Sequence, residues 1–260
     1  MPEILEVEFY RRAAEAVTGR TISTVHADDT WYLKGGTTRR RLHTALVDHT
    51  IEAVRRHGKL LLFDLLDAPA LGIRFGMTGR LLVDGVPAIA GLEYSSVRLD
   101  RSWNRFSLSF REGGSLRVND PRRLGGVELE PALELLGPDA LALTRHQLIQ
   151  AVRGAQAPIK ARLMDQARIA GLGNLLVDEI LWRAGISPTR PAGSLSPPEV
   201  GHLHRHVRST LKLLGRRGGS HTGDLQDERS RDGVCPRDGS PLRRETVGGR
   251  TTYFCPAHQV

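Results

Sequence analysis

The chain has 260 residues, a net charge of +8 and two cysteines. That length allows one large domain or two modest ones, and the low cysteine count argues against a disulfide scaffold and fits a reducing compartment. No apolar run is long enough to span a membrane, and the acidic, helical amino terminus is unlike a signal peptide, so we expect a cytoplasmic, nucleoid-associated protein.

The charge balance gives a first indication of a partner. Lys and Arg number 37 against 29 Asp and Glu. Such an excess favours a polyanion, with nucleic acid as the first candidate. A generally arginine-rich surface would give the same balance, so charge alone does not decide between the two.

The amino terminus carries the first candidate for chemistry. Removal of Met1 would expose the secondary amine of Pro2. Such an amine can attack an aldehyde-like carbon and form an iminium, and an α-amino group titrates near pH ~8, far below lysine. Apolar residues then recur at helical spacing up to Gly19, which predicts a leading helix with Glu3 and Glu6 in its first turn. Many chains begin with Met-Pro, so this segment by itself does not establish catalysis.

Residues 20–128 have the pattern of β-structure. Short apolar or alternating stretches are separated by glycine turns, and they cover 21–25, 51–56, 60–66, 72–75, 81–83, 106–110 and 116–118. Many short strands joined by glycine turns predict an antiparallel sandwich.

Residues 144–218 instead have helical periodicity, broken at glycines and prolines. One break is Gly171-Leu172-Gly173-Asn174, between two predicted helices. A glycine-rich turn that leads into a helix can present backbone N–H groups to a phosphate. Asn174 is predicted either to cap the second helix or to donate its amide to a phosphate.

The last forty residues, rich in glycine and arginine, predict a small module with metal-ligand spacing. Cys235 and Asp238 form one pair and Cys255 and His258 another, each with two residues between its members. This is the layout of a zinc ribbon in which Asp and His take the places of two cysteines. A hairpin held by packing alone, without metal, is the alternative.

In order and spacing, six motifs resemble the formamidopyrimidine-DNA glycosylase / endonuclease VIII family. The resemblance covers the whole chain and rests on Pro2-Glu3 with Glu6, Gly58-Lys59, Gly76-Met77-Thr78-Gly79, Asp120-Pro121-Arg122-Arg123, Gly171-Leu172-Gly173-Asn174 and the stretch Gly249 to Cys255. It implies an α+β fold: a leading helix with an antiparallel β-sandwich (1–130), a helix-two-turn-helix domain (131–218) and a zinc-finger-like β-hairpin (219–260).

The resemblance also implies catalytic roles. Pro2 would attack C1′ of a damaged nucleoside, Glu3 would act as general acid or base, and Glu6 would support the helix near Pro2. Lys59 would reach a DNA phosphate and aid catalysis, although it could also be a solvated hairpin charge.

Further residues are implied to bind DNA. Asn174 and Arg250 would hold the phosphates that flank the flipped nucleotide, and Lys160 would lie near the phosphates or the extruded base. Met77, which could also be a core residue, would fill the vacated space together with Arg122, and Arg123 and Leu124 beside it would also bind DNA.

Three departures from the family pattern affect these expectations. Leu124 stands where purine-specific members have Phe, and Leu can wedge between bases but stacks poorly. The stretch from Gly218 to Cys235 is short and lacks a longer lesion-capping loop. Asp238 and His258 replace two cysteines, which puts the zinc in question. The preferred lesion, an oxidised purine or an oxidised pyrimidine, therefore stays open.

The function we expect is a monomeric, bifunctional DNA glycosylase and abasic-site lyase of base excision repair. It would act on double-stranded DNA with damaged bases or abasic sites, through an imine on Pro2 and β,δ-elimination. The alternatives are a non-catalytic damaged-DNA-binding protein and an abasic-site lyase with little base removal.

Overall fold

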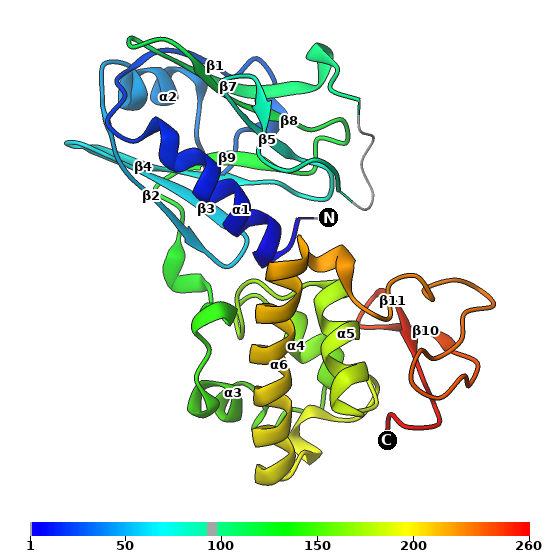
Figure 1. Cartoon of the computed structure of the whole chain (residues 1–260). Coiled ribbons are helices and arrows are strands. Elements are labelled where there is room, and N and C mark those ends of the chain that lie inside the picture. Colours follow the sequence, from blue (N-terminus) through cyan, green and yellow to red (C-terminus); the bar gives the residue numbers. More distant parts are fainter. Residues whose placement is uncertain (1, 93–97) are drawn as a thin grey trace. The chain divides into compact units, whose positions relative to one another are not determined.

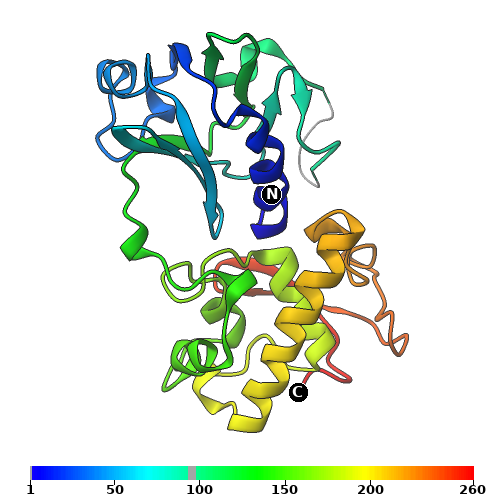
Figure 2. The same cartoon turned by 60° about the vertical axis from the view of Figure 1, so that its left-hand side comes forward.

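The computed structural model describes residues 2–92 and 98–260 (Figures 1 and 2). The chain forms two compact units, of which the first holds Met1–Pro2 and Glu6–Leu133. The second holds Glu134–Val260 together with the short segment Glu3–Leu5. No helix among the described residues has the length and apolar character needed to cross a membrane.

The first unit is built on two antiparallel sheets, as predicted. One sheet has the order β1-β7-β8-β5-β6 and the other β2-β3-β4-β9. The strands of the first are β1 (Ile22–His26), β5 (Arg80–Val83), β6 (Val86–Pro87), β7 (Asn104–Phe110) and β8 (Ser115–Asn119). Those of the second are β2 (Ile51–His57), β3 (Leu60–Leu65), β4 (Ala68–Arg74) and β9 (Gly126–Leu129).

Alternation of side chains fills the space between these sheets. On β7, Phe106, Leu108 and Phe110 are buried, whereas the serines between them are half-buried. Helix α1 (Ile4–Ala14) adds Tyr10, whose ring centroid lies 4.5 Å from that of Phe75. The period of two therefore identified the core face correctly.

Two features of this unit differ from the expectation of a mostly β segment. Residues 39–46 form a short helix, α2 (Arg39–Leu46), capped by the Thr38 hydroxyl and buried through Leu42 and Leu46. The predicted turn at 76–79 joins two sheets and not two neighbouring strands, because β4 and β5 lie in different sheets.

The second unit contains four helices among its described residues. They are α3 (Arg145–Val152), α4 (Ile159–Met164), α5 (Asn174–Ala184) and α6 (Pro197–Arg217). Helices α3 and α6 begin with capping boxes at Thr144 and Ser196. Their apolar faces share one core, which α6, drawn yellow to orange in Figure 2, lines along its length through Val200, Leu203, Val207, Leu211 and Leu214.

The last part of the second unit is a two-stranded hairpin of β10 (Arg243–Val247) and β11 (Arg250–Phe254). Gly248 and Gly249 form its turn with φ of 58° and 71°. Positive φ at both central turn residues is the requirement of a type I′ turn, and glycine adopts it without steric cost. A small separate core with Trp182, Leu225, Cys235 and Cys255 supports this region.

Seven single-turn 3₁₀ helices complete the described regular structure. They are η1 (Glu15–Val17), η2 (Thr30–Tyr32), η3 (Arg101–Trp103), η4 (Leu133–Leu135), η5 (Ala140–Ala142), η6 (Ala192–Ser194) and η7 (Ser220–Thr222).

Candidate active site and DNA interface

Glu3 is fixed by the amino terminus of helix α5. Its carboxylate is fully buried and accepts hydrogen bonds from the backbone N–H groups of Leu175 at 2.9 Å and Leu176 at 3.3 Å. The first N–H groups of a helix have no partner inside the helix and favour a negative charge. Glu3 therefore caps a helix that begins 171 residues after it in the chain.

The two glycines of the 171–173 loop make room for this contact. A Cβ on Gly173 would lie 2.3 Å from Glu3 Cδ, and a Cβ on Gly171 would lie 2.4 Å from Ile4 Cδ1. Gly171 also has φ of 114°, and its carbonyl accepts a hydrogen bond from Ile4 N at 3.1 Å. The glycines that sequence analysis associated with phosphate binding thus also seat residues 3 and 4.

The prediction that Asn174 caps α5 is wrong. Gly173 occupies the cap position without a side-chain bond, and Asn174 is the first helical residue. The side-chain Oδ1 of Asn174 is buried and has no hydrogen-bond partner among the described residues. The capping role belongs to Glu3, so the alternative interpretation of Asn174 as a phosphate ligand is the one left.

Pro2 directly precedes the leading helix. Helix α1 begins at Ile4, so the expectation that Glu3 lies in its first turn is wrong, whereas Glu6 does lie there and is buried. Met1, whose removal the chemistry of Pro2 requires, lies outside the described residues.

Lys59 lies at the tip of the β2–β3 hairpin. Gly58 and Lys59 form its two-residue turn, and Gly58 has φ of 57°. Sequence analysis missed the residue that fixes this tip, Arg56. Its guanidinium donates to the Gly58 carbonyl at 2.9 Å and to Glu8 of α1 at 3.1 Å. Arg56 shares a strand face with buried Val54, and an arginine on an apolar face could have signalled a buried partner.

A buried aspartate organises the loop that carries Arg122. Asp120 is fully buried and accepts hydrogen bonds from the Thr78 hydroxyl at 2.6 Å and the Tyr32 hydroxyl at 3.3 Å. The backbone N–H groups of Gly125, at 2.9 Å, and Arg122, at 3.3 Å, donate to the same carboxylate. Asp120 thereby joins the 76–79 crossover to the 120–125 loop, so the two predicted void-filling segments do lie together.

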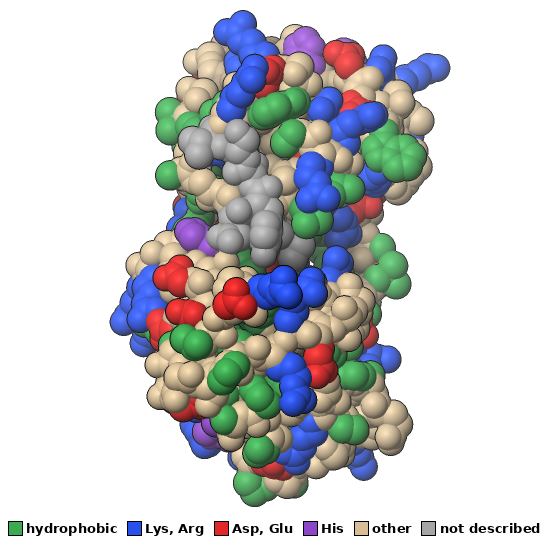
Figure 3. All heavy atoms as spheres, turned by 90° about the vertical axis from the view of Figure 1, so that its right-hand side faces the viewer, with side chains coloured by type: hydrophobic (Ala, Val, Ile, Leu, Met, Phe, Trp, Pro, Cys, Tyr) green, Lys and Arg blue, Asp and Glu red, His purple; other side chains and the backbone are tan. Residues whose placement is uncertain are grey.

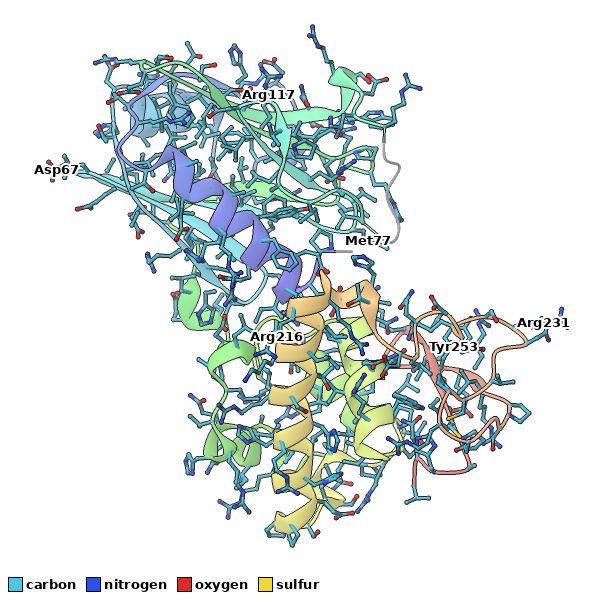
Figure 4. All side chains as sticks on the ribbon, in the orientation of Figure 1. Asp67, Met77, Arg117, Arg216, Arg231 and Tyr253 are labelled. Carbon is cyan, nitrogen blue, oxygen red and sulfur yellow. The ribbon has the colours of Figure 1, made fainter. Side chains whose placement is uncertain are left out.

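Within these segments the predicted residues differ in exposure. Leu124 is 51% exposed, and Met77 is half-buried in the crossover after β4 (Figure 4). Arg123 has a positive φ of 56°, and its guanidinium forms two 2.6 Å hydrogen bonds with Asp29. The hydrogen bond from Arg123 holds the pKa of Asp29 below its usual value.

Lys160 lies in a closed site of the second unit. Its side chain is fully buried, and its Nζ lies 2.7 Å from Asp178 Oδ1. It also donates to Thr252 Oγ1 at 2.7 Å and to the Thr251 carbonyl at 3.2 Å. Burial lowers the pKa of Lys160, and the neighbouring Asp178 opposes this effect. Arg250, in contrast, is exposed at the start of β11.

The four predicted metal ligands converge at the end of the second unit. The ligand atoms of Cys235, Asp238, Cys255 and His258 all lie within 4.8 Å of one another. Tetrahedral zinc with bonds of about 2.0–2.3 Å requires ligand atoms roughly 3.3–3.8 Å apart. Cys235 Sγ lies 3.7 Å from His258 Nδ1, and Cys255 Sγ lies 3.4 Å from Asp238 Oδ2, so this donor set fits zinc.

Trp182 contacts two of these four residues, His258 and Cys235. His258 Nε2 lies 3.2 Å from the Trp182 carbonyl, which orients Nδ1 toward the other ligands. The indole N–H of Trp182 donates to Cys235 Sγ at 3.3 Å. Burial raises the pKa of the Cys255 thiol, so a bound cation would be needed to hold it as a thiolate.

On the surface drawn in Figure 3, Lys and Arg side chains occur on both units with acidic side chains between them. The fold and the site define a class of protein: a two-sheet unit behind an amino-terminal proline and a buried acid, a glycine loop ahead of a helix, and a hairpin with a metal-type cluster.

Known proteins identify the family within this class. Residues 1–127 match the formamidopyrimidine-DNA glycosylase N-terminal domain and residues 136–224 match the formamidopyrimidine-DNA glycosylase H2TH domain. The formamidopyrimidine-DNA glycosylase of Paracoccus denitrificans is 35% identical over the full length of both chains. That of Chloroflexus aurantiacus is 34% identical, covering 100% of this chain and 98% of the relative.

Solved structures agree with this match. Lactococcus lactis Fpg in complex with THF-DNA and an inhibitor has a TM-score of 0.83 and 28% identity, covering 100% of both chains. Lactococcus lactis Fpg with abasic-site DNA gives a TM-score of 0.82 at 26% identity, covering 99% of each chain. The chain belongs to the formamidopyrimidine-DNA glycosylase family. It is a DNA glycosylase and abasic-site lyase of base excision repair.

Proposed function

We propose that this chain excises damaged bases through a covalent imine on Pro2. The secondary amine attacks C1′, the base leaves with its bonding electron pair, and the sugar ring opens to an iminium. The observation that carries this proposal is the seating of Glu3: two backbone N–H groups hold its carboxylate, one peptide bond away from the nucleophile. Glu3 then acts as the general acid or base at the sugar.

The lyase steps follow from the same intermediate. The iminium withdraws electrons and acidifies the C2′ proton, so β-elimination expels the 3′ phosphate and δ-elimination expels the 5′ phosphate. Hydrolysis of the imine then frees the enzyme and leaves a one-nucleotide gap. Lys59 reaches a DNA phosphate and aids these steps, and buried Glu6 supports the helix near Pro2.

DNA binding is divided between two groups of residues. Asn174 and Arg250 hold the phosphates that flank the flipped nucleotide, while Met77, Arg122 and Leu124 fill the space it leaves. The exposure of Leu124 and Arg250 supports these roles. Arg123, bound to Asp29, orients the loop. An Arg250→Ala change is expected to lower the salt slope of binding by about one phosphate.

The substrates are oxidised or ring-opened bases in double-stranded DNA, and formamidopyrimidines come first. The relatives are named formamidopyrimidine-DNA glycosylases, and one Lactococcus lactis Fpg structure contains Fapy-dG DNA. We further propose a monomeric, cytoplasmic and nucleoid-associated enzyme, with its helix-two-turn-helix domain over 131–218 and its finger over 219–260.

The finger holds one zinc ion through two thiolates, one carboxylate and one imidazole. The metal would fix the hairpin, and no step of the reaction passes through it. Metal analysis of the purified chain should give about one zinc per molecule. Asp238→Ala should lower that content, whereas Asp232→Ala, at an exposed position outside the ligand set, should leave it unchanged. Metal-free wild-type protein would contradict the assignment.

Borohydride trapping on a duplex with an abasic site tests the enzyme reaction. Wild type should give a covalent adduct, and Pro2→Gly should reduce it sharply while DNA affinity stays near normal. An alanine inserted between Met1 and Pro2 is the matched control, because it locks the proline nitrogen into a peptide bond. Binding without trapping in wild type would favour a non-catalytic damaged-DNA-binding protein, and trapping without base release on a lesion panel would favour a plain lyase.

A further inference from the structure

The ammonium group of Lys160 is enclosed by acceptors of the protein itself. Three acceptors lie within reach of its three N–H bonds, namely Asp178 Oδ1, Thr252 Oγ1 and the Thr251 carbonyl. The side chain has no exposed surface. Contact with a phosphate would require Lys160 to break its ion pair with Asp178 and to leave its buried position, which is costly.

The partners of Lys160 come from separate segments that meet here. Asp178 lies on α5 and forms a second ion pair with Arg229, whose guanidinium lies 5.2 Å from the ring centroid of Tyr253 on β11 (Figure 4). The hairpin turn is equally close, because a Cβ on Gly248 would lie 2.8 Å from the Ala161 Cβ on α4. Helices α4 and α5 therefore set the position of β11.

Two proposed phosphate ligands are attached to the ends of this network. Thr252, which accepts the bond from Lys160, donates its hydroxyl to the Arg250 carbonyl at 3.0 Å. Asn174 precedes Asp178 by four residues, so the two lie on one face of α5. A chain of side-chain and backbone contacts thus runs from Asn174 along α5, through Lys160, to Arg250.

We propose that Lys160 is a positioning residue and not a phosphate ligand: with Asp178 it fixes β11 against α5, and so sets the distance between Arg250 and Asn174. This inference rests on the proposed role of Arg250 at a phosphate. The buried ion pair sets the distance between Arg250 and Asn174 before DNA binds. Binding therefore does not require the hairpin to rearrange.

The direction in which Asp178→Asn changes DNA affinity distinguishes a positioning role from a purely electrostatic one. The change adds one unit of positive charge, so a purely electrostatic view predicts tighter DNA binding. Positioning predicts weaker binding, by about five- to tenfold, because Lys160 loses its ionic partner. The readout is the dissociation constant for a duplex with a tetrahydrofuran abasic analogue, measured by fluorescence anisotropy across a salt series. Asp232→Asn, at an exposed position of the same unit, is the charge-matched control and should bind as tightly as wild type or more tightly.

A double-mutant cycle between Lys160→Met and Arg250→Ala completes the test. If Lys160 acts through Arg250, the double variant binds no more weakly than Arg250→Ala alone and has the same salt slope. Additive losses, with the slope reduced by about two phosphates, would show that Lys160 holds a phosphate itself and would overturn the proposal. Tighter binding by Asp178→Asn would overturn it as well.

Two measurements keep these outcomes distinct from misfolding and from failure of the functional assignment. Lys160→Met leaves Asp178 paired with Arg229, so this variant should melt near wild type, yet bind weakly. Amide exchange at Thr251 and Thr252 should quicken in Asp178→Asn while α3 stays protected; unchanged exchange would contradict the positioning role. An unchanged salt slope in Arg250→Ala would instead refute the proposed phosphate contact.

Discussion

Each unit of this protein depends on a buried aspartate, but the two aspartates are satisfied differently. Asp120 in the first unit receives only neutral donors: two hydroxyls and two backbone N–H groups. Asp178 in the second unit is paired with two cations, Lys160 and Arg229. The Asp120 carboxylate fixes the conformation of its loop by accepting hydrogen bonds from the loop backbone. The Asp178 carboxylate joins segments that are distant in the chain.

The difference indicates how each region responds to substitution of its aspartate or of the residues paired with it. A loop wrapped around Asp120 loses its shape when that side chain is removed, because several buried donors lose their acceptor at once. The network around Asp178 keeps one ion pair when either cation is replaced, and its role is to hold the spacing of other parts. We expect substitutions at Asp120 to act mainly on stability and those at Lys160 mainly on DNA affinity.

The largest expected effect is that of Asp120→Ala. It leaves the Thr78 and Tyr32 hydroxyls and the Gly125 N–H without their acceptor, which should lower the free energy of unfolding by about 3 kcal/mol. Urea denaturation measures the change. Asp64→Ala removes a surface ion pair with Arg55 and should cost less than about 1 kcal/mol. An equal loss in the free energy of unfolding for the two variants would show that the hydrogen bonds to Asp120 stabilise the fold no more than a surface ion pair does.

Gly173→Ala tests a third buried carboxylate, Glu3, which resembles Asp120 in taking backbone donors. The new methyl would lie 2.3 Å from Glu3 Cδ, so either the acid or the loop must move. Overpacking should cost about 2 kcal/mol, and displacement of Glu3 should slow borohydride trapping by roughly 100-fold.

Gly215→Ala is the matched glycine control. Its Cβ would meet Leu5 at an ordinary 3.6 Å within helix α6, so we expect a gain of about 0.5–1 kcal/mol and unchanged trapping. Normal trapping by Gly173→Ala would show that the seat of Glu3 is not needed for the reaction.

The smallest effect is expected for Glu199, an acid paired with a cation at the surface. Its bonds from Arg190 and Ser196 lower its pKa to about 2. The stability it contributes is present above the unfolded pKa near 4.5 and is lost as the pH falls toward 2. An NMR titration should give this midpoint, and in Arg190→Gln the midpoint should rise toward the ordinary value. A wild-type midpoint near 4.5 would show that the pair is not formed in solution.

Local patterns in the sequence determined much of this protein. The alternation over 106–110, the glycine turns and the ligand spacing over 235–258 each concern residues close in the chain. The two-sheet unit and the metal-type cluster followed from these patterns, whereas the C-terminal hairpin was implied by the family resemblance. The short helix α2 was the exception, because its few apolar residues give a weak helical signal within a β-rich segment.

The tertiary structure alone decided how the site is supported. Glu3 meets Leu175 across 172 residues of sequence, and this contact transfers the capping role away from Asn174. Lys160 looks like a free cation in the sequence, and only the approach of Asp178 and β11 buries it. Packing and the cost of leaving a buried charge unpaired determine which groups become partners. Local periodicity in the sequence does not predict these long-range partners.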